Sequence, residues 1–249
     1  MSGDDRMLER VRRLLSKAEG AATDAERDAY NGKAAELIAR YGIEEALLAA
    51  QQTAPQHAAD RVVTLDAPYA RDKGSLLAAV ASPLRVRAVL RSNRQGVGTE
   101  LSMHLFGMRA DLDRVDVLYT SLLVQAAHGL AVVRPRNGYE SVAAYRRSWM
   151  IGFAYVIQQR LIAAEEAVRV QAEEGRMANG AATGTPSVSL VLADRDALVD
   201  QVVAEAYPRL RTARSRMLSG SGSAEGAAAG RRADLGSPRL GRRARSALK

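Results

Sequence analysis

The segment WMIGFAYVIQQRLIAA, residues 149–164, forms the middle of a predicted helix from residue 140 to about residue 174, around which the other elements are expected to pack. At about 100° per residue, one arc covering nearly half of this helix is apolar. The arc consists of Val142, Trp149, Phe153, Val156, Ile157, Leu161, Ala164 and Val168. A second apolar line, formed by Ile151, Tyr155 and Ile162, falls on the opposite side. We therefore expect a central helix that contacts neighbours on both flanks.

Two arginines, Arg146 and Arg160, fall within the apolar arc, close to Phe153 and Ala164. A buried guanidinium needs a carboxylate, backbone carbonyls or an anionic ligand, because burial without a partner is costly. Each arginine is therefore a candidate for a structural ion pair or for an anion site, and the sequence leaves both open.

Two segments upstream of this helix alternate between apolar and polar residues, which predicts a β-hairpin. The apolar set is Leu84, Val86, Ala88 and Leu90 in residues 84–91, and Leu101, Met103 and Leu105 in residues 99–106. The opposite face would present Arg85, Arg87, Arg91, His104 and Phe106. Basic residues beside an aromatic ring on a strand face are one way to bind nucleic acid. The alternative is a face that is solvated or covered by a helix.

Further elements complete an α+β domain over residues 61–208. Strands are predicted at 61–66 and 187–193, a short helix at 75–81, a long helix at 111–133, and a last helix that Asp194 caps and Pro208 ends. The fold class is α+β, with a small, mainly antiparallel sheet packed on the helices near 110–133 and 140–174.

Three carboxylates, Asp111, Asp113 and Asp116, cluster at the start of the first long helix. Carboxylates are favourable at the positive end of a helix dipole, which explains their position without a ligand. No histidine or second carboxylate motif supports them, so we expect no metal site.

The first fifty residues predict a helical hairpin. A helix over residues 4–18 is followed by a short connection, and Thr23-Asp24-Ala25-Glu26 fits a capping box for a second helix that Gly42 ends. The seam would contain Leu14, Leu15, Leu37 and Ile38, and residues 43–50 could add a third short helix. Residues 51–60 contain Pro55 and are typical of a linker.

This N-terminal unit resembles the bacterial and phage family known as domain of unknown function 2786. The similar positions are Val11, Arg12, Leu14, Leu15, Ala18, an acidic and alanine-rich second helix, Ala34, Leu37 and Tyr41-Gly42-Ile43. Downstream residues resemble the companion domain that often follows it, at Leu105-Phe106-Gly107, Tyr119, Gly152-Phe153-Ala154, Arg160-Leu161 and Tyr207-Pro208. The resemblance implies a bacterial or phage-related protein, and the family brings no established activity, substrate or catalytic residue.

The positive charge of the chain is concentrated in residues 209–249. This segment holds eleven basic residues against Glu225 and Asp234, whereas the first 208 residues hold 25 basic and 26 acidic side chains. Such clustering favours an anionic partner, DNA or RNA, although a charged tail can also serve only to keep a protein soluble. The predicted nucleic-acid-binding residues are Arg209, Arg211, Arg214, Arg216, Arg231, Arg232, Arg239, Arg242, Arg243 and Arg245. Residues 219–230 are a run of Gly, Ser and Ala without the ending of a phosphate loop, so we predict a linker or tail there.

Composition and motifs exclude several kinds of site. The chain has no cysteine and three scattered histidines, and it lacks a serine elbow, a zinc-protease motif and a dinucleotide fingerprint, so no catalytic, cofactor or metal residue is predicted. We expect a cytoplasmic protein, because a signal peptide is not apparent and polar residues interrupt the most apolar stretch, residues 117–133. The predicted function is a non-enzymatic, nucleic-acid-associated accessory protein. The alternatives are a protein-interaction module that uses the N-terminal helices, and an enzyme whose site is assembled from distant residues.

Overall fold

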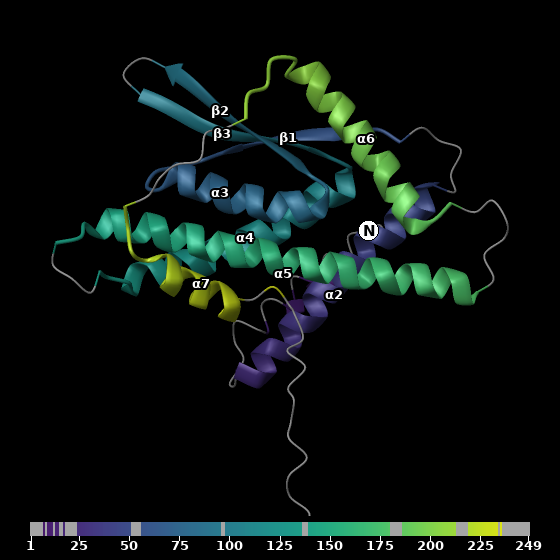
Figure 1. Cartoon of the computed structure of the whole chain (residues 1–249), viewed down its shortest axis with the longest axis horizontal. Coiled ribbons are helices and arrows are strands. Elements are labelled where there is room, and N and C mark those ends of the chain that lie inside the picture. Colours follow the sequence, from purple (N-terminus) through teal and green to yellow (C-terminus); the bar gives the residue numbers. More distant parts are fainter. Residues whose placement is uncertain are drawn as a thin grey trace, which may run out of the picture.

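A computed structural model shows the long central helix, α5 (Val142–Ala178), along the length of the molecule (Figure 1). The structure describes residues 7, 9–11, 13–14, 17, 24–50, 56–95, 98–135, 139–179, 186–212, 219–233 and 235, with the backbone alone for residues 24–35, 94–95 and 98. The Ser141 hydroxyl accepts a hydrogen bond from the amide of Ala144, which caps the start of α5. The prediction of a long central helix is confirmed.

One arc of α5 is buried and the second apolar line is not. Trp149, Phe153 and Ile157 are at most 2% exposed, whereas Tyr155 is 61% and Ile162 is 47% exposed. The expectation that the second line contacts a neighbour is therefore wrong for Tyr155 and Ile162, while Ile151 is partly buried. Another helix, α7 (Ser223–Arg232), approaches the α5 backbone at Gly152, where no side chain stands between the two helices.

The predicted hairpin is confirmed as part of a three-stranded antiparallel sheet, but its first strand begins at Arg87 and not at residue 84, because residues 82–84 form a 3₁₀ turn and Arg85 has a positive φ. Strands β1 (Ala59–Thr64), β2 (Arg87–Gln95) and β3 (Gly98–Gly107) are arranged in the order β1-β3-β2. In the register, Ala88 pairs with Leu105 and Leu90 with Met103. The sheet lies over α3 (Ala70–Ala81), and α4 (Arg109–Val132) and α5 lie beyond α3 (Figure 1).

The main core lies between the inner face of the sheet and these helices. Buried side chains such as Leu76, Leu105, Leu118 and Phe153 come from α3, β3, α4 and α5 and form one cluster. A 3₁₀ turn, η1 (Ser82–Leu84), connects α3 to the sheet. Among the described residues, α4 is the one helix long and apolar enough to cross a membrane, a test that the core helix of a soluble protein also passes.

The predicted strand at residues 187–193 is wrong, because these residues begin α6 (Val188–Ala206). The Ser187 hydroxyl caps the helix by accepting from the amide of Leu190, so Asp194 lies within the helix and does not cap it. Val188, Val191 and Leu192 are buried at helical spacing, whereas Leu190 is 52% exposed. The apparent alternation of Val188, Leu190 and Leu192 was therefore misleading.

Helix α2 (Asp24–Ala50) continues through Gly42, so the predicted end at Gly42 is wrong. The described residues before α2 that carry the predicted first helix are helical, and Val11 is fully buried in the main core with Leu37 and Ile38. Leu15 and the connection before α2 lie outside the described residues, so the hairpin itself stays a prediction.

The Gly, Ser and Ala run forms helix α7 (Ser223–Arg232), so the linker predicted there is wrong. Its backbone packs directly against that of α5. A Cβ added to Gly226 would lie 2.7 Å from the carbonyl carbon of Trp149, and one added to Gly152 would lie 2.8 Å from that of Ser223. Only residues without a side chain allow this approach, which is why a glycine-rich sequence folds here.

Candidate functional site

The predicted basic face of the hairpin is covered by α6 and is not an open surface. Val89 and Phe106, which project from this face, form a buried cluster with Val199 and Val203 of α6. This arrangement corresponds to the second alternative drawn from the sequence.

Two arginines of this face are neutralised by carboxylates of α6. Arg85 donates to Asp196 at 3.2 Å, and Arg87 donates to Asp200 at 2.6 Å and 3.1 Å. The hydrogen bond with Asp200 raises the pKa of the Arg87 guanidinium, while burial raises the pKa of the Asp196 carboxyl. Arg91 is exposed at the uncovered end of the face.

His104 joins α6 to the sheet through a short hydrogen-bonded array. Its Nδ1 lies 2.7 Å from the hydroxyl of Tyr207, and its Nε2 lies 2.8 Å from Asp60 Oδ2. Phe106 packs against both the His104 and Tyr207 rings. The array fastens the end of α6 to β1 and β3, and each imidazole nitrogen has a partner.

A buried ion cluster lies between α4 and α5, and the sequence analysis did not predict it. Arg114 is 1% exposed and donates to Asp111 at 2.8 Å and also to Glu165. Burial alone lowers the pKa of the guanidinium, but the charges of Glu165 and Asp111 raise it overall, so Arg114 stays charged. The signal for Glu165 was its position four residues after Leu161 and three before Val168, within the buried arc of α5.

Gly42 of α2 lies against this cluster. A Cβ at Gly42 would overlap Nη1 and Cζ of Arg114 and would lie 3.1 Å from its Nε. The glycine therefore gives the guanidinium room at the contact between α2 and the rest of the core. Its role is close packing inside a helix and not helix termination.

The other two carboxylates of α4 form ion pairs with the sheet. Arg61 of β1 donates to Asp113 at 2.8 Å and also to Asp116. Within the described ranges, no group of three or more carboxylate or imidazole side chains is placed to hold a metal ion.

The two arginines of the α5 arc have different environments. Arg160 donates to the carbonyl oxygen of Gly230 at 2.7 Å, and to that of Ala233, so it caps the end of α7. Backbone carbonyls are thus its partners. Arg146 is half-buried, and its Nε has no hydrogen-bond partner among the residues that the structure describes.

The described arginines of the C-terminal segment are exposed on two parts of the surface. Arg209 and Arg211 follow α6, and Arg231 and Arg232 form the last turn of α7. No carboxylate of the described residues pairs with any of the four. The remaining predicted residues, Arg214, Arg216, Arg239, Arg242, Arg243 and Arg245, lie outside the described residues.

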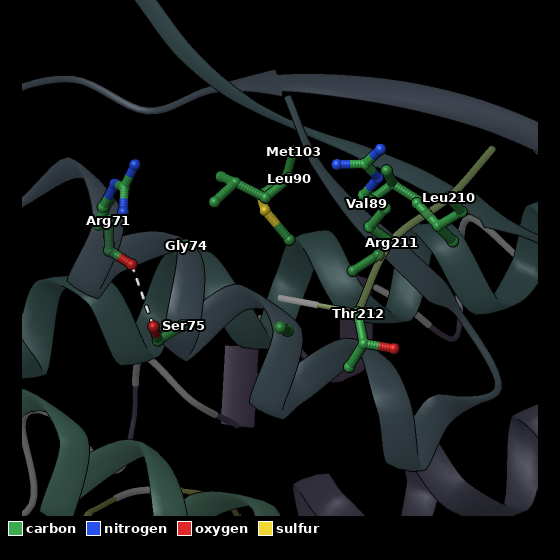
Figure 2. Close-up of a pocket in the computed structure, with 11 residues that line it drawn as sticks. Arg71, Gly74, Ser75, Val89, Leu90, Met103, Leu210, Arg211 and Thr212 are labelled. Carbon is green, nitrogen blue, oxygen red and sulfur yellow. Dashed lines mark hydrogen bonds between the residues drawn. The ribbon is translucent and has the colours of Figure 1, made fainter. Parts of the chain in front are cut away.

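A cavity of about 460 Å³ opens beside β2, where the chain passes from α6 towards α7 (Figure 2). It is bordered by α3, β2, β3 and the segment 210–212. The lining residues are Arg71, Gly74, Ser75, Ala78, Ala88, Val89, Leu90, Met103, Leu210, Arg211 and Thr212. We call this site the β2-edge cavity. It combines an apolar interior with two arginines, and no carboxylate of the described part of the chain lines it.

Comparison with known families gives a match over the N-terminal helices. Residues 6–45 match a family described as "Protein of unknown function (DUF2786)", which confirms the N-terminal part of the resemblance seen in the sequence. No curated protein and no solved structure matches the chain. The resemblance of the downstream residues to a companion domain stays a prediction. The chain therefore carries a DUF2786 domain at residues 6–45, and Gly42, which accommodates Arg114, lies within it.

Proposed function

We propose that the protein binds DNA or RNA through the arginine-rich segment 209–249 and acts as a binding accessory and not as an enzyme. The observation that supports this proposal is which arginines form ion pairs with carboxylates and which do not. Arg85 and Arg87 on the sheet are neutralised by carboxylates, whereas the described arginines of the C-terminal segment are exposed and have no carboxylate partner among the described residues.

Unpaired guanidinium groups at the surface suit a phosphate backbone. Each can neutralise one phosphate and release a condensed counterion, which gives salt-dependent binding with little sequence preference. The local charge supports this mode, since residues 209–249 carry a net charge of +9. Binding of this kind needs no catalytic constellation.

A truncation is unsuitable for testing this proposal, because α7 is packed against α5. Deleting residues 209–249 would remove α7 from the surface of α5 and would uncover the backbone of Trp149 and Phe153, so lost binding by the truncated chain would be ambiguous. Substitution at exposed positions keeps the fold. The test variant is therefore the triple substitution Arg209→Gln, Arg231→Gln and Arg232→Gln.

Fluorescence anisotropy with labelled duplex DNA and single-stranded RNA, measured over a series of salt concentrations, gives the readout. If all three arginines contact phosphates, the slope of log affinity against log salt should become less negative by about 2 to 3, at roughly 0.7 to 0.9 per contact. The matched control removes the same charge from arginines already paired with nearby glutamates, by Arg13→Gln, Arg40→Gln and Arg169→Gln.

The control variant should retain most of the wild-type slope. Equal slopes for the wild type, the test variant and the control would show that these arginines do not contact nucleic acid. An equal loss in the test and control variants would show that only net charge matters, which would also contradict the proposed contact.

A further inference from the structure

The β2-edge cavity has an interior suited to an apolar group. Ala78, Ala88 and Met103 line it, and two large apolar side chains beside them are left partly in water, Leu90 at 42% and Leu210 at 54% exposed. Its volume of about 460 Å³ falls within the range of roughly 300 to 1,000 Å³ typical of small-molecule sites. A bound apolar chain would therefore remove protein surface from water as well as its own.

Backbone groups also face this cavity, because β2 is an edge strand. The amide of Leu65 donates to the carbonyl of Leu101, so Leu101 faces β1, and the alternation along β3 makes His104 face β2. Val89 is opposite His104 in the register and faces β3. Its neighbours Ala88 and Leu90 therefore direct their N–H and C=O groups away from the sheet, and no backbone group of the described residues pairs with them.

The charged groups of the cavity are of one sign. Arg71 and Arg211 lie on opposite sides of the Met103 side chain (Figure 2). Neither has a carboxylate partner among the described residues. The Ser75 hydroxyl donates to the backbone carbonyl of Arg71, as the dashed line in Figure 2 marks, and leaves its own oxygen as an acceptor. An anionic group at either end of the cavity would meet a guanidinium.

From these features we propose that the β2-edge cavity binds a small amphiphile, an unbranched apolar chain with an anionic head group. The chain would lie against Ala78, Leu90 and Met103, and the head group would accept hydrogen bonds from Arg71 or Arg211. A neutral chain would leave both guanidinium groups without a partner. This site shares Arg211 with the segment proposed to contact nucleic acid, but it needs neither α7 nor the residues after it.

Decanoate is the probe for this proposal, with decyl phosphate and 1-decanol as comparison ligands, each kept below its micelle concentration. Isothermal titration calorimetry of the full chain should give saturable binding of decanoate or decyl phosphate, and binding of decanol at least tenfold weaker. The two anions distinguish a carboxylate source from a phosphate source. No saturable binding of either anion, or equal binding of decanol, would overturn the proposal.

Three single variants locate the site. Arg71→Gln and Arg211→Gln remove the charges, and loss of the arginine that holds the head group should weaken anion binding roughly tenfold or more, which corresponds to one charge-assisted hydrogen bond. Ala78→Met fills the interior and should abolish binding. Arg40→Gln, at a surface arginine paired with Glu36, is the control and should bind as the wild type does. Wild-type affinity in all three cavity variants would place the ligand elsewhere and contradict the assignment.

The two arginine variants keep the test decisive if the Ala78→Met variant does not fold. The two proposals also fail separately. Ala78→Met should leave the salt slope of nucleic-acid binding unchanged, and the triple arginine variant at 209, 231 and 232 should leave the decanoate affinity unchanged.

Discussion

Replacing Gly226 by alanine should destabilise the protein, although alanine favours helix more than glycine does. A Cβ at Gly226 would overlap the carbonyl oxygen of Trp149 and would lie 2.7 Å from its carbonyl carbon, whereas ordinary contacts begin at 3.4 Å, so α7 must move away from α5. Overpacking of this kind costs about 1–3 kcal/mol. The helix propensity of alanine offsets up to about 1 kcal/mol of that cost.

Gly175 provides the matched control, because it lies in α5 and a Cβ there would meet no atom within 4 Å. Gly175→Ala should therefore stabilise the protein by up to about 1 kcal/mol from propensity alone. Subtracting the two effects isolates the packing cost at Gly226, about 1–3 kcal/mol. For a chain of this length, each kcal/mol corresponds to a Tm change of about 2–4 °C.

Thermal and urea denaturation followed by circular dichroism would measure both effects. The chain has a single tryptophan, Trp149, which is 1% exposed; its backbone contacts Gly226 of α7 and its indole ring packs against Gly129 of α4, so its fluorescence reports on the core next to the contact. Gly226→Ala should shift its emission to longer wavelength and Gly175→Ala should not. Equal stability of the two variants, together with an unchanged emission maximum, would refute the backbone contact between α7 and α5.

Two further predictions concern buried polar groups. Arg114→Met leaves two carboxylates buried without a counter-charge, so the free energy of unfolding measured in urea should fall by about 3–5 kcal/mol. The control, Arg40→Met at an exposed ion pair, should change it little. Equal effects of the two substitutions would contradict the buried cluster. Burial raises the pKa of Tyr119 to about 12, whereas a tyrosine in the unfolded chain ionises near 10. The folded state then holds the proton more tightly between pH 10 and 12, so stability should decrease as pH rises through that window, and less so in Tyr119→Phe. Identical Tm profiles of the two proteins between pH 9 and 12 would show that Tyr119 does not contribute.

Several elements followed from local sequence patterns. The apolar arc around Trp149 and Phe153 repeats at helical spacing over many turns, and the hairpin alternates on both strands, so each pattern specifies its own backbone conformation. The same reasoning failed at residues 187–193. A run of seven residues there satisfies both periods, and burial of Val188, Val191 and Leu192 against α2 and α5 selected the helix.

Local sequence patterns were sufficient to predict the α5 helix, the hairpin and the concentration of positive charge in residues 209–249. The interaction partners of charged side chains and of the glycine-rich helix were visible only in the tertiary structure. A strand pattern places Arg87 on a face but cannot show that Asp200, far along the chain, neutralises it. The glycines at 222, 226 and 230 predict a linker when only neighbouring residues are considered. In the folded chain they allow α7 to pack against the backbone of α5. Hydrophobic periodicity and local composition depend only on residues that are close in sequence. Ion pairing and close helix packing depend on which distant segments the folded chain brings together.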